Sequence, residues 1–397
     1  MEQQPAAATG VAGPSKQPET FAEENNKDRL YCAIKLRPTP VFREGMSGEH
    51  AIIVVGDKKR WLNGTVLHYY FYNDPDEGSD IEMSDGTTEW RTWAGAPAQQ
   101  DIVREAFAKW KAIGIGLEFQ EVATREPAEI RIGFQLGGGS WSSVGREDIL
   151  DVKDPNQRTM NFGWDLDDPN DVENYGRDTA LHEIGHSLGL LHEHQSPFSG
   201  LEWDEIAVYA YFGLGTRNNW CPKRIKDNIL TPADPGSVTG SAWDVNSVME
   251  YRFDPGLVRK PKPYDTNGIK PAGGLSKLDK AWVSRVYPPL APVKDELHLA
   301  QMQPLNVANG VQRNFIIEPQ NSGHYTVEAS GKGDTVMALF ENNDGAFRYV
   351  RGDDDSGETR SAKLQVHLQK GQQYVLRAKQ VYNADLTNPV ELALRMQ

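Results

Sequence analysis

The sequence predicts an α+β domain at residues 59–287 and a smaller all-β sandwich at residues 301–397. Helical and strand-like apolar patterns are mixed in the first region. A histidine-rich motif in the middle of that region fits a helix that ends in a sharp turn. After a proline-rich linker at residues 288–300, six short alternating segments separated by turn residues indicate a sandwich.

The histidine-rich motif reads H-E-x-x-H-x-x-G-x-x-H. Its fixed positions are His182, Glu183, His186, Gly189 and His192. His182 and His186 are four residues apart, so on a helix they share one face, with Cβ atoms about 6 Å apart. On a continuing helix His192 would lie about 9 Å farther along the axis, so the helix must end before it. Gly189 can adopt the left-handed conformation that ends the helix and returns His192 to the other two.

Three neutral imidazoles leave a tetrahedral Zn²⁺ with one open position, which is the catalytic arrangement. We therefore expect one Zn²⁺ per chain, with His182, His186 and His192 as ligands. Glu183 lies next to a ligand and can act as the general base for a water that the metal activates. The alternative is a helix with scattered surface histidines, and it requires five positions to match by chance.

The motif resembles that of the metzincin metallopeptidases, and Glu193 directly after the third histidine is typical of the astacin family. Metzincins also carry a methionine-containing turn beneath the metal, and Ser247–Tyr251 resembles it. In astacins the tyrosine of this turn, here Tyr251, is an extra zinc ligand that swings away to stabilise the oxyanion. Glu250 replaces the usual histidine and Ser196 replaces an arginine, and both departures concern substrate specificity.

The resemblance implies a metzincin-type catalytic domain. Such a domain has a twisted, mostly parallel sheet with an antiparallel edge strand, two long helices, and zinc at the cleft. It further implies a zinc-dependent endopeptidase that acts on polypeptides, with Glu183 and Tyr251 as catalytic residues. In astacins the glutamate that corresponds to Glu193 binds the new N-terminus formed when the pro-segment is removed. The alternatives are a weak or inactive metzincin that binds proteins through its C-terminal sandwich, and a zinc hydrolase of a non-peptide bond.

Several elements of this domain can be placed in advance. Apolar residues recur at helical spacing over 97–113, and residues 276–287 read as a terminal helix with Ser276 as its N-cap. Asp178 or Thr179 is expected to cap the metal-binding helix. The glycine-rich loop at 137–145 leads to the expected edge strand, with a surface hairpin as the alternative.

Residues 1–58 read as a disordered leader and a candidate pro-segment. Residues 1–28 are rich in Ala, Pro, Gln, Glu and Lys and lack the apolar core of a secretory signal, so disorder is expected there. Cys32 and Asp57 are candidates for a latch on the zinc, since pro-segments of related peptidases use such residues. A buried structural cysteine and a Cys32–Cys221 disulfide are the alternatives for Cys32. The compartment stays open, although the resemblance implies an extracellular protein that is exported without a visible signal peptide.

The C-terminal sandwich resembles the pre-peptidase C-terminal domains that are appended to secreted microbial proteases. Asp344 and the run Asp353–Asp355 offer clustered oxygens to a Ca²⁺ ion. A solvated acidic turn is the alternative.

The 397 residues carry a net charge of −14, which argues against nucleic acid as a partner. No run of about 18 apolar residues occurs, so no transmembrane segment is predicted. We expect a monomer whose partners are polypeptide substrates.

Overall fold

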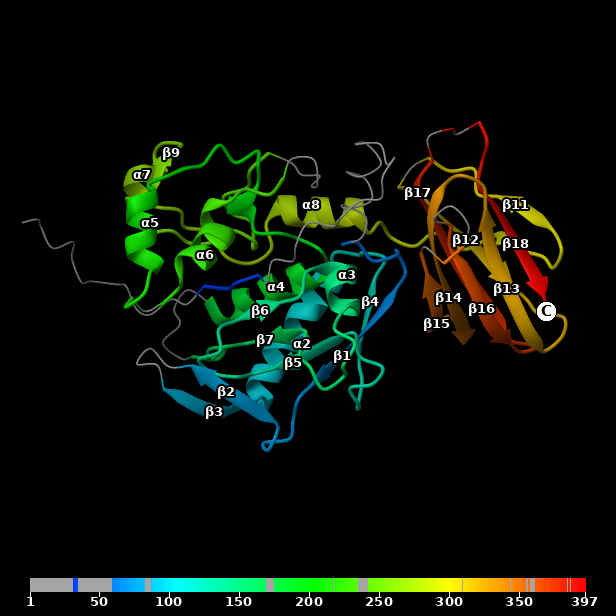
Figure 1. Ribbon diagram of the computed structural model, residues 1–397, viewed down its shortest axis with the longest axis horizontal. Coiled ribbons are helices and arrows are strands. Elements are labelled where there is room, and N and C mark those ends of the chain that lie inside the picture. The colour runs from blue at the N-terminus through cyan, green and yellow to red at the C-terminus, as the bar shows by residue number, and fades with distance from the viewer. Residues whose placement is uncertain are drawn as a thin grey trace, which may run out of the picture.

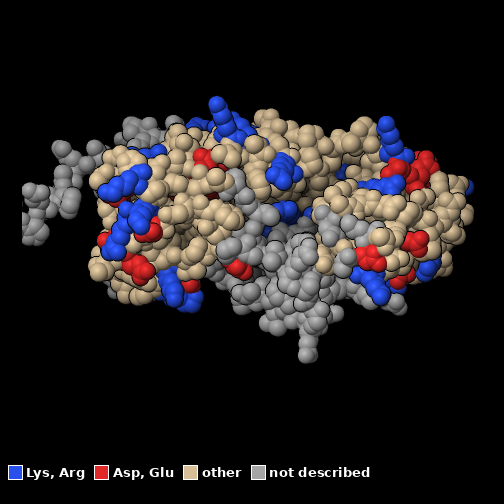
Figure 2. Space-filling view, turned by 90° about the horizontal axis from the view of Figure 1, so that it is seen from above, with Lys and Arg blue, Asp and Glu red and all other residues tan. Residues whose placement is uncertain are grey.

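The computed structural model describes residues 31–34, 59–82, 87–168, 175–216, 218–234, 242–308, 310–343, 345–354, 356–357, 361–383, 385 and 387–397. The chain forms an α+β domain and, at one end of it, a sandwich of strands (Figure 1). The face in Figure 2 carries small mixed groups of basic and acidic side chains at both ends. Among the described helices, none has the length and apolar character needed to cross a bilayer.

The sheet of the α+β domain has five strands in the order β4-β1-β5-β7-β6. They are β1 (Val66–Phe71), β4 (Glu118–Glu121), β5 (Ile130–Gly133), β6 (Trp141–Ser142) and β7 (Met160–Asn161). The first four strands in the spatial order run parallel, while β6 pairs antiparallel with β7 at the edge. The expected mostly parallel sheet with an antiparallel edge strand is confirmed.

Two helices, α2 (Pro97–Lys111) and α4 (Tyr175–Ser187), pack against each other beside this sheet. The ring of Phe107 stacks on that of Tyr69 in β1, with 4.3 Å between centroids. The indole of Trp110 is fully buried and donates a hydrogen bond of 3.1 Å to the Leu181 carbonyl. These contacts fix α4, and with it the histidine motif, against the core.

Helix α4 begins earlier than expected, at Tyr175. Asp178 and Thr179 therefore lie inside its first turns, and the prediction that one of them is the N-cap is wrong. Asp178 instead accepts a hydrogen bond from the Gly274 backbone, and the Thr179 hydroxyl donates to the Tyr175 carbonyl. Asp178 thus ties the helix to a residue 96 positions away, a contact that no local sequence pattern reveals.

The terminal helix α8 (Lys277–Val286) has the predicted start. Ser276 and Asp279 form a capping box, in which each side chain accepts a hydrogen bond from the other residue's backbone N–H. Shorter elements complete the domain. They are β2 (Gly78–Glu82), β3 (Thr88–Thr92), α3 (Gly145–Leu150), η1 (Glu193–Gln195), β8 (Glu202–Trp203), α5 (Glu205–Phe212), α6 (Pro222–Ile225), η2 (Lys226–Leu230), β9 (Val258–Lys260) and α7 (Tyr264–Asn267).

The C-terminal part is a sandwich of two sheets, with orders β10-β12-β17-β14-β15 and β11-β18-β13-β16. Its strands are β10 (Asp295–Glu296), β11 (Met302–Pro304), β12 (Gln312–Ile317), β13 (Gly323–Ser330), β14 (Asp334–Asn343), β15 (Ala346–Asp353), β16 (Lys363–Leu368), β17 (Gln373–Tyr382) and β18 (Glu391–Met396). Six of these strands match the predicted segments, whereas β10, β11 and β15 were not foreseen. Strand β10 lies within residues 288–300, so the first sandwich strand begins inside the expected linker.

The candidate calcium ligands lie on both sides of β15, with Asp344 before it and Asp353–Asp355 at and after its end. Asp344 and Asp355 lie outside the described residues. One carboxylate oxygen of Asp353 accepts hydrogen bonds from the backbone N–H groups of Ser356 and Lys363, at 3.1 and 2.8 Å. That carboxylate stabilises the turn that follows β15, and the calcium site stays a prediction.

The sandwich packs on the turn at residues 62–65, which directly precedes β1 of the α+β domain. Leu62 forms an apolar cluster with residues of the sandwich, namely Val336, Ala338, Phe340, Val381 and Phe347. The Arg377 guanidinium lies over Gly64 and donates a hydrogen bond of 3.3 Å to the Asn63 carbonyl. The Gln312 side chain accepts from the Asn63 N–H at 3.0 Å and donates to its carbonyl at 2.8 Å. The two domains therefore share an interface rather than only a linker.

Candidate active site

The three motif histidines converge on one point, as predicted. His182 and His186 come from α4, and their Nε2 atoms lie 3.1 Å apart. The helix stops at Ser187, Gly189 has a φ of 92°, and the chain turns so that His192 joins them. One ligand atom from each of the three, together with Cys32 Sγ, lies within 4.8 Å of the others.

Hydrogen bonds to the Nδ1 atoms set the tautomers of the two helix histidines. His182 Nδ1 lies 2.8 Å from the Val248 carbonyl and His186 Nδ1 lies 2.8 Å from the Leu190 carbonyl. A carbonyl only accepts, so both Nδ1 atoms carry the proton and both Nε2 atoms carry a lone pair. Two lone pairs facing each other at 3.1 Å repel unless a cation lies between them. Two nitrogens on one tetrahedral Zn²⁺ are about 3.3 Å apart, which fits this pair.

The third histidine is oriented by a residue that sequence reasoning missed. The Gln195 amide nitrogen donates 2.8 Å bonds to the carbonyls of Asp227 and Thr231, so its oxygen must face the other way. That oxygen lies 3.1 Å from His192 Nδ1 and accepts its proton. The Nε2 of His192 is therefore also a lone-pair donor. Gln195 follows His192 by three residues, but nothing local marks it as its partner.

Burial keeps the three imidazoles neutral. It lowers the pKa of His182 to about 4, and it lowers the pKa values of His186 and His192 well below the ordinary range. Neutral imidazole is the form that binds a metal. The residues present therefore fit a zinc ion with three nitrogen ligands.

Glu183 is fully buried beside the cluster and is not one of its ligands. Its Oε2 accepts a hydrogen bond of 3.5 Å from the Cys32 thiol, whereas its Oε1 has no partner among the described residues. Burial raises the pKa of this carboxyl to about 8. A buried carboxylate oxygen without a partner is costly, and it suits a group that must receive a proton.

The methionine turn lies where the resemblance implies. Met249 Sδ would be 2.5 Å from a Cβ at position 185, so a side chain at this point of α4 would displace the methionine. Asp279, at the start of α8, accepts from the Ser247 hydroxyl at 2.7 Å and from the Val248 N–H at 2.9 Å. The terminal helix thus fixes the turn beneath the metal site.

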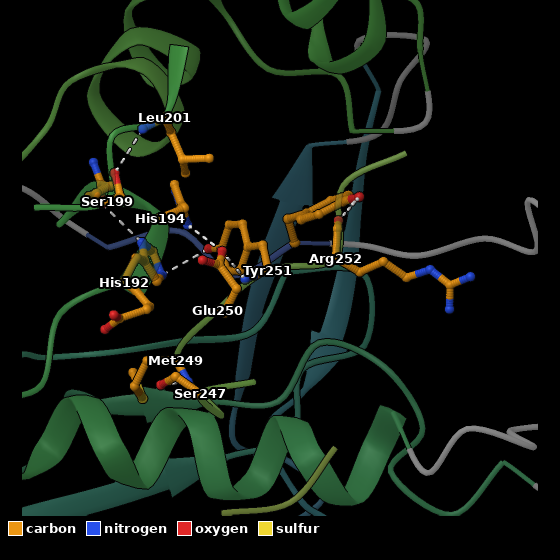
Figure 3. A network of polar contacts seen from close by, with 12 residues as sticks. His192, His194, Ser199, Leu201, Ser247, Met249, Glu250, Tyr251 and Arg252 are labelled. Atoms are coloured by element: carbon orange, nitrogen blue, oxygen red, sulfur yellow. Dashed lines mark hydrogen bonds and ion pairs between the residues drawn. The ribbon is translucent and has the colours of Figure 1, made fainter. Parts of the chain in front are cut away.

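Tyr251 reaches the cluster from this turn. Its hydroxyl oxygen lies 2.8 Å from His192 Nε2, and it donates its proton to the Cys32 carbonyl. The side chains of Glu250 and Tyr251 are turned towards His192 and His194 (Figure 3). Tyr251 therefore lies within reach of a metal held by the histidines.

Glu250 and His194 form a second layer behind the cluster. Glu250 accepts a hydrogen bond of 2.7 Å from the Trp243 indole, and its Oε1 lies 3.7 Å from His194 Nδ1. His194 was expected at the surface or just behind the ligands. It is 2% exposed and donates through Nε2 to the Asn228 carbonyl at 2.9 Å. The surface alternative is wrong, because the ring packs against Tyr251 with 4.6 Å between centroids.

Glu193 has a partner other than a chain terminus. Its Oε1 accepts a 2.8 Å hydrogen bond from the Asp244 backbone N–H. Burial raises the pKa of this carboxyl to about 7.

The leader enters the site through residues 31–34. Cys32 is buried, and its Sγ lies 3.7 Å from His186 Nε2. The disulfide alternative is wrong, because Cys32 and Cys221 are both free and Cys221 is exposed. Asp57, the other latch candidate, lies outside the described residues. Residues 31–34 belong to the candidate pro-segment, and they lie against the histidine cluster.

A cavity of about 530 Å³ adjoins the cluster on the side of His182 and Glu183. The start of α4 and residues after the methionine turn line it, including Tyr175, Thr179 and Lys270. Tyr31 and Cys32 form part of its wall. A polypeptide bound at the histidines would have room for a side chain here.

Comparison with known proteins agrees with this geometry. The profile of the family described as Matrixin matches residues 87–198, which include the three histidines and Glu183. The match supports a zinc metallopeptidase domain of the metzincin type. A search among curated proteins finds no match.

Among solved structures, that of myroilysin is similar, with 29% identity and a TM-score of 0.48. The similarity covers 59% of this chain and 98% of that chain. The pre-peptidase C-terminal domain of a collagenase from Bacillus anthracis is similar with 12% identity and a TM-score of 0.21. It covers 26% of this chain and 98% of that chain.

Proposed function

We propose that this protein is a zinc-dependent endopeptidase of the astacin type, with His182, His186 and His192 as metal ligands. The convergence of three lone-pair nitrogens beside an unpartnered, buried carboxylate oxygen carries the proposal. When bound, zinc would lower the pKa of a water to about 7 and polarise the peptide carbonyl.

Glu183 is the general base in this proposal. Its Oε1 takes the proton of the attacking water and later delivers it to the leaving amine. The hydroxyl of Tyr251 stabilises the negative charge that develops on the carbonyl oxygen. That hydroxyl donates to the Cys32 carbonyl in the present structure, so it becomes available when the leader departs.

The edge of the sheet binds the substrate backbone. The Ala33 N–H donates to the Ser140 carbonyl at 3.4 Å, directly before β6, which supports pairing of an extended chain along this edge. The same contact supports the interpretation of residues 1–58 as an inhibitory pro-segment. In this interpretation Cys32 occupies the position that substrate needs, and thiolate is a good zinc ligand.

The remaining assignments rest on the resemblance. We infer an extracellular monomer whose sandwich is of the pre-peptidase C-terminal type, with polypeptides as substrates. The alternative of an inactive binding module is less well supported, because a scaffold has no use for a fully buried, unpartnered glutamate.

Glu183→Ala tests the function directly. In a Cys32→Ala background, it should lower kcat/KM on casein by about 10³-fold or more, while zinc content measured by mass spectrometry stays at one per chain. Glu118→Ala, at an exposed position on β4, is the matched control and should leave the rate unchanged. A chelator should abolish the activity of the Cys32→Ala protein and of its Glu118→Ala control. Undiminished cleavage by the Glu183→Ala variant would show that the base is misassigned.

A further inference from the structure

A pocket for an aromatic side chain lies beside the metal site and holds the ring of Tyr31, which is 6% exposed. Four rings surround it, with centroids between 4.8 and 6.4 Å from that of Tyr31: Tyr211, Phe212, Tyr251 and Phe253. Three of the four contacts are edge-to-face or tilted, which aromatic pairs favour.

The far end of the pocket is polar. The Tyr31 hydroxyl donates a 2.8 Å hydrogen bond to the Arg252 carbonyl and lies 3.5 Å from the Tyr211 hydroxyl. The Tyr211 hydroxyl in turn donates to Asp254 at 2.9 Å. An aromatic wall that ends in a carbonyl acceptor is complementary to a phenol.

The walls belong to the domain itself. Phe212 and Phe253 are fully buried. Trp220 stacks behind Phe212 with 5.5 Å between centroids, and Trp203 packs on Phe253 at 4.8 Å. Because the walls are packed from behind, the pocket does not need the leader to define its shape.

The neighbouring leader residues are held through their backbone. The Ala33 N–H donates to the Ser140 carbonyl, and the Ile34 N–H donates to the Asn228 side chain at 2.8 Å. The Cys32 carbonyl accepts from the Tyr251 hydroxyl. Every polypeptide has these groups, so the cleft can hold any extended chain in this way. Tyr31, whose ring fills the aromatic pocket, directly precedes Cys32, whose thiol faces the histidines.

We propose that this pocket is a substrate subsite that selects a tyrosine side chain close to the cleaved bond once Tyr31 has left it. The inference rests on the proposed peptidase function and names its substrate class, namely polypeptides with a tyrosine within two residues of the cleavage site. Phenylalanine fills the rings but leaves the Arg252 carbonyl without its phenol donor. Alanine leaves a void among four rings.

The pocket can be tested without metal or catalysis. In the full-length Tyr31→Ala variant, p-cresol, which has the atoms of a tyrosine side chain, should bind in the vacated space and raise the Tm. Toluene, which lacks the hydroxyl, should raise the Tm less. Neither compound should shift the wild-type protein, in which Tyr31 fills the pocket. No shift of the variant with either compound would mean that the pocket closes, and it would overturn the proposal.

Substrate selection can be tested with the full-length Tyr31→Ala/Cys32→Ala variant. Peptides that differ only in one tyrosine, phenylalanine or alanine are compared by fluorescence anisotropy, and cleavage sites are mapped by mass spectrometry. We expect tyrosine to bind about tenfold more tightly than phenylalanine. We expect a difference on the order of 100-fold from alanine. The Cys32→Ala variant that keeps Tyr31 should show a smaller preference, because Tyr31 competes for the pocket.

The outcomes separate the two proposals. Cleavage without a preference for tyrosine overturns the subsite and leaves the peptidase function intact. Tyrosine-selective binding without cleavage of any peptide overturns the peptidase function and leaves the subsite intact. Should the double variant fail to fold, Tyr31→Phe/Cys32→Ala keeps the ring and weakens only its hydroxyl contact. Its preference for tyrosine must then exceed that of Cys32→Ala, and equal preferences overturn the subsite.

Discussion

The leader and the sandwich both contact the catalytic domain, but the two contacts differ in kind. The leader reaches the histidine cluster through the Cys32 thiol, and its backbone makes hydrogen bonds that any extended chain could make. The sandwich buries the Arg377 guanidinium, 1% exposed, over Gly64 and packs Phe340 around Leu62. The first contact covers the proposed active site, whereas the second covers the turn that holds Leu62 and Gly64. We therefore expect the leader to be removable and the sandwich to be permanent.

The largest effect is expected at the leader. Cys32→Ala removes the thiol that holds the leader at the histidine cluster, so the leader should leave the site and the proteolytic rate of the full chain should rise by 100-fold or more. That is roughly the gain when a site that is about 99% blocked becomes open. The measurement is casein cleavage by the unprocessed protein, with its intact mass confirmed. Cys221→Ala, at the exposed cysteine, is the control and should change nothing. Equal activity of wild type and Cys32→Ala would show that the leader does not block the site.

The histidine motif and the methionine turn were predictable because each is a short pattern with fixed spacing. The spacing of His182, His186 and Gly189 is dictated by helix geometry, and the capping box of α8 is equally local. The sheet with its antiparallel edge strand followed from the family resemblance.

Contacts between residues that are distant in the sequence could not be predicted from such short patterns. The Cys32 thiol contacts Glu183, which lies 151 residues away in the sequence. The residues next to Cys32 in the sequence do not distinguish a metal ligand from a buried thiol. Gln195 orients His192 only because η2 folds back to hold its amide. Strand β15 was missed because its last residues, Gly352 and Asp353, were read as part of the acidic turn that follows them. The interface residue Leu62 reads like any core leucine.

The second largest effect tests the permanence of the sandwich contact. Gly64 has a φ of +90°, and a Cβ there would lie 1.6 Å from Arg377 Nη1. Gly64→Ala should therefore lower the free energy of unfolding by about 3 kcal/mol, through backbone strain and displacement of the guanidinium. Gly114→Ala is the matched control, because Gly114 has a φ of +88° and open space around its Cβ position. Denaturant unfolding should show a smaller loss for Gly114→Ala, and equal losses would mean that the guanidinium yields freely.

Arg377→Ala should cost less, about 2 kcal/mol. The side chain loses its charged hydrogen bond to the Asn63 carbonyl and its packing over the rings of Phe340 and Phe347, 4.4 and 4.9 Å from their centroids. The loss is limited because burial lowers the pKa of this guanidinium to about 10, a sign that its charge is poorly solvated. Arg395→Ala, at an exposed arginine of β18, is the control for the unfolding measurement.

The two substitutions should also be coupled. In the Arg377→Ala background, Gly64→Ala should cost only its backbone strain, about 1–2 kcal/mol, because no guanidinium remains to be displaced. A double-mutant cycle measures this difference. Additive losses would mean that Gly64 and Arg377 stabilise the protein independently, and the interface would then not depend on their close approach.

The smallest effect is expected at the rim of the same interface. Arg146 of the catalytic domain faces Asp354 of the sandwich at 3.6 Å, and the aspartate side chain is 49% exposed. An ion pair this open to water contributes about 0–0.5 kcal/mol, and salt screens it. Asp354→Asn should therefore leave the free energy of unfolding unchanged within error, at low and at high salt. A loss comparable to that of Arg377→Ala would place the strength of the interface in its charged rim rather than in the buried contacts around Gly64.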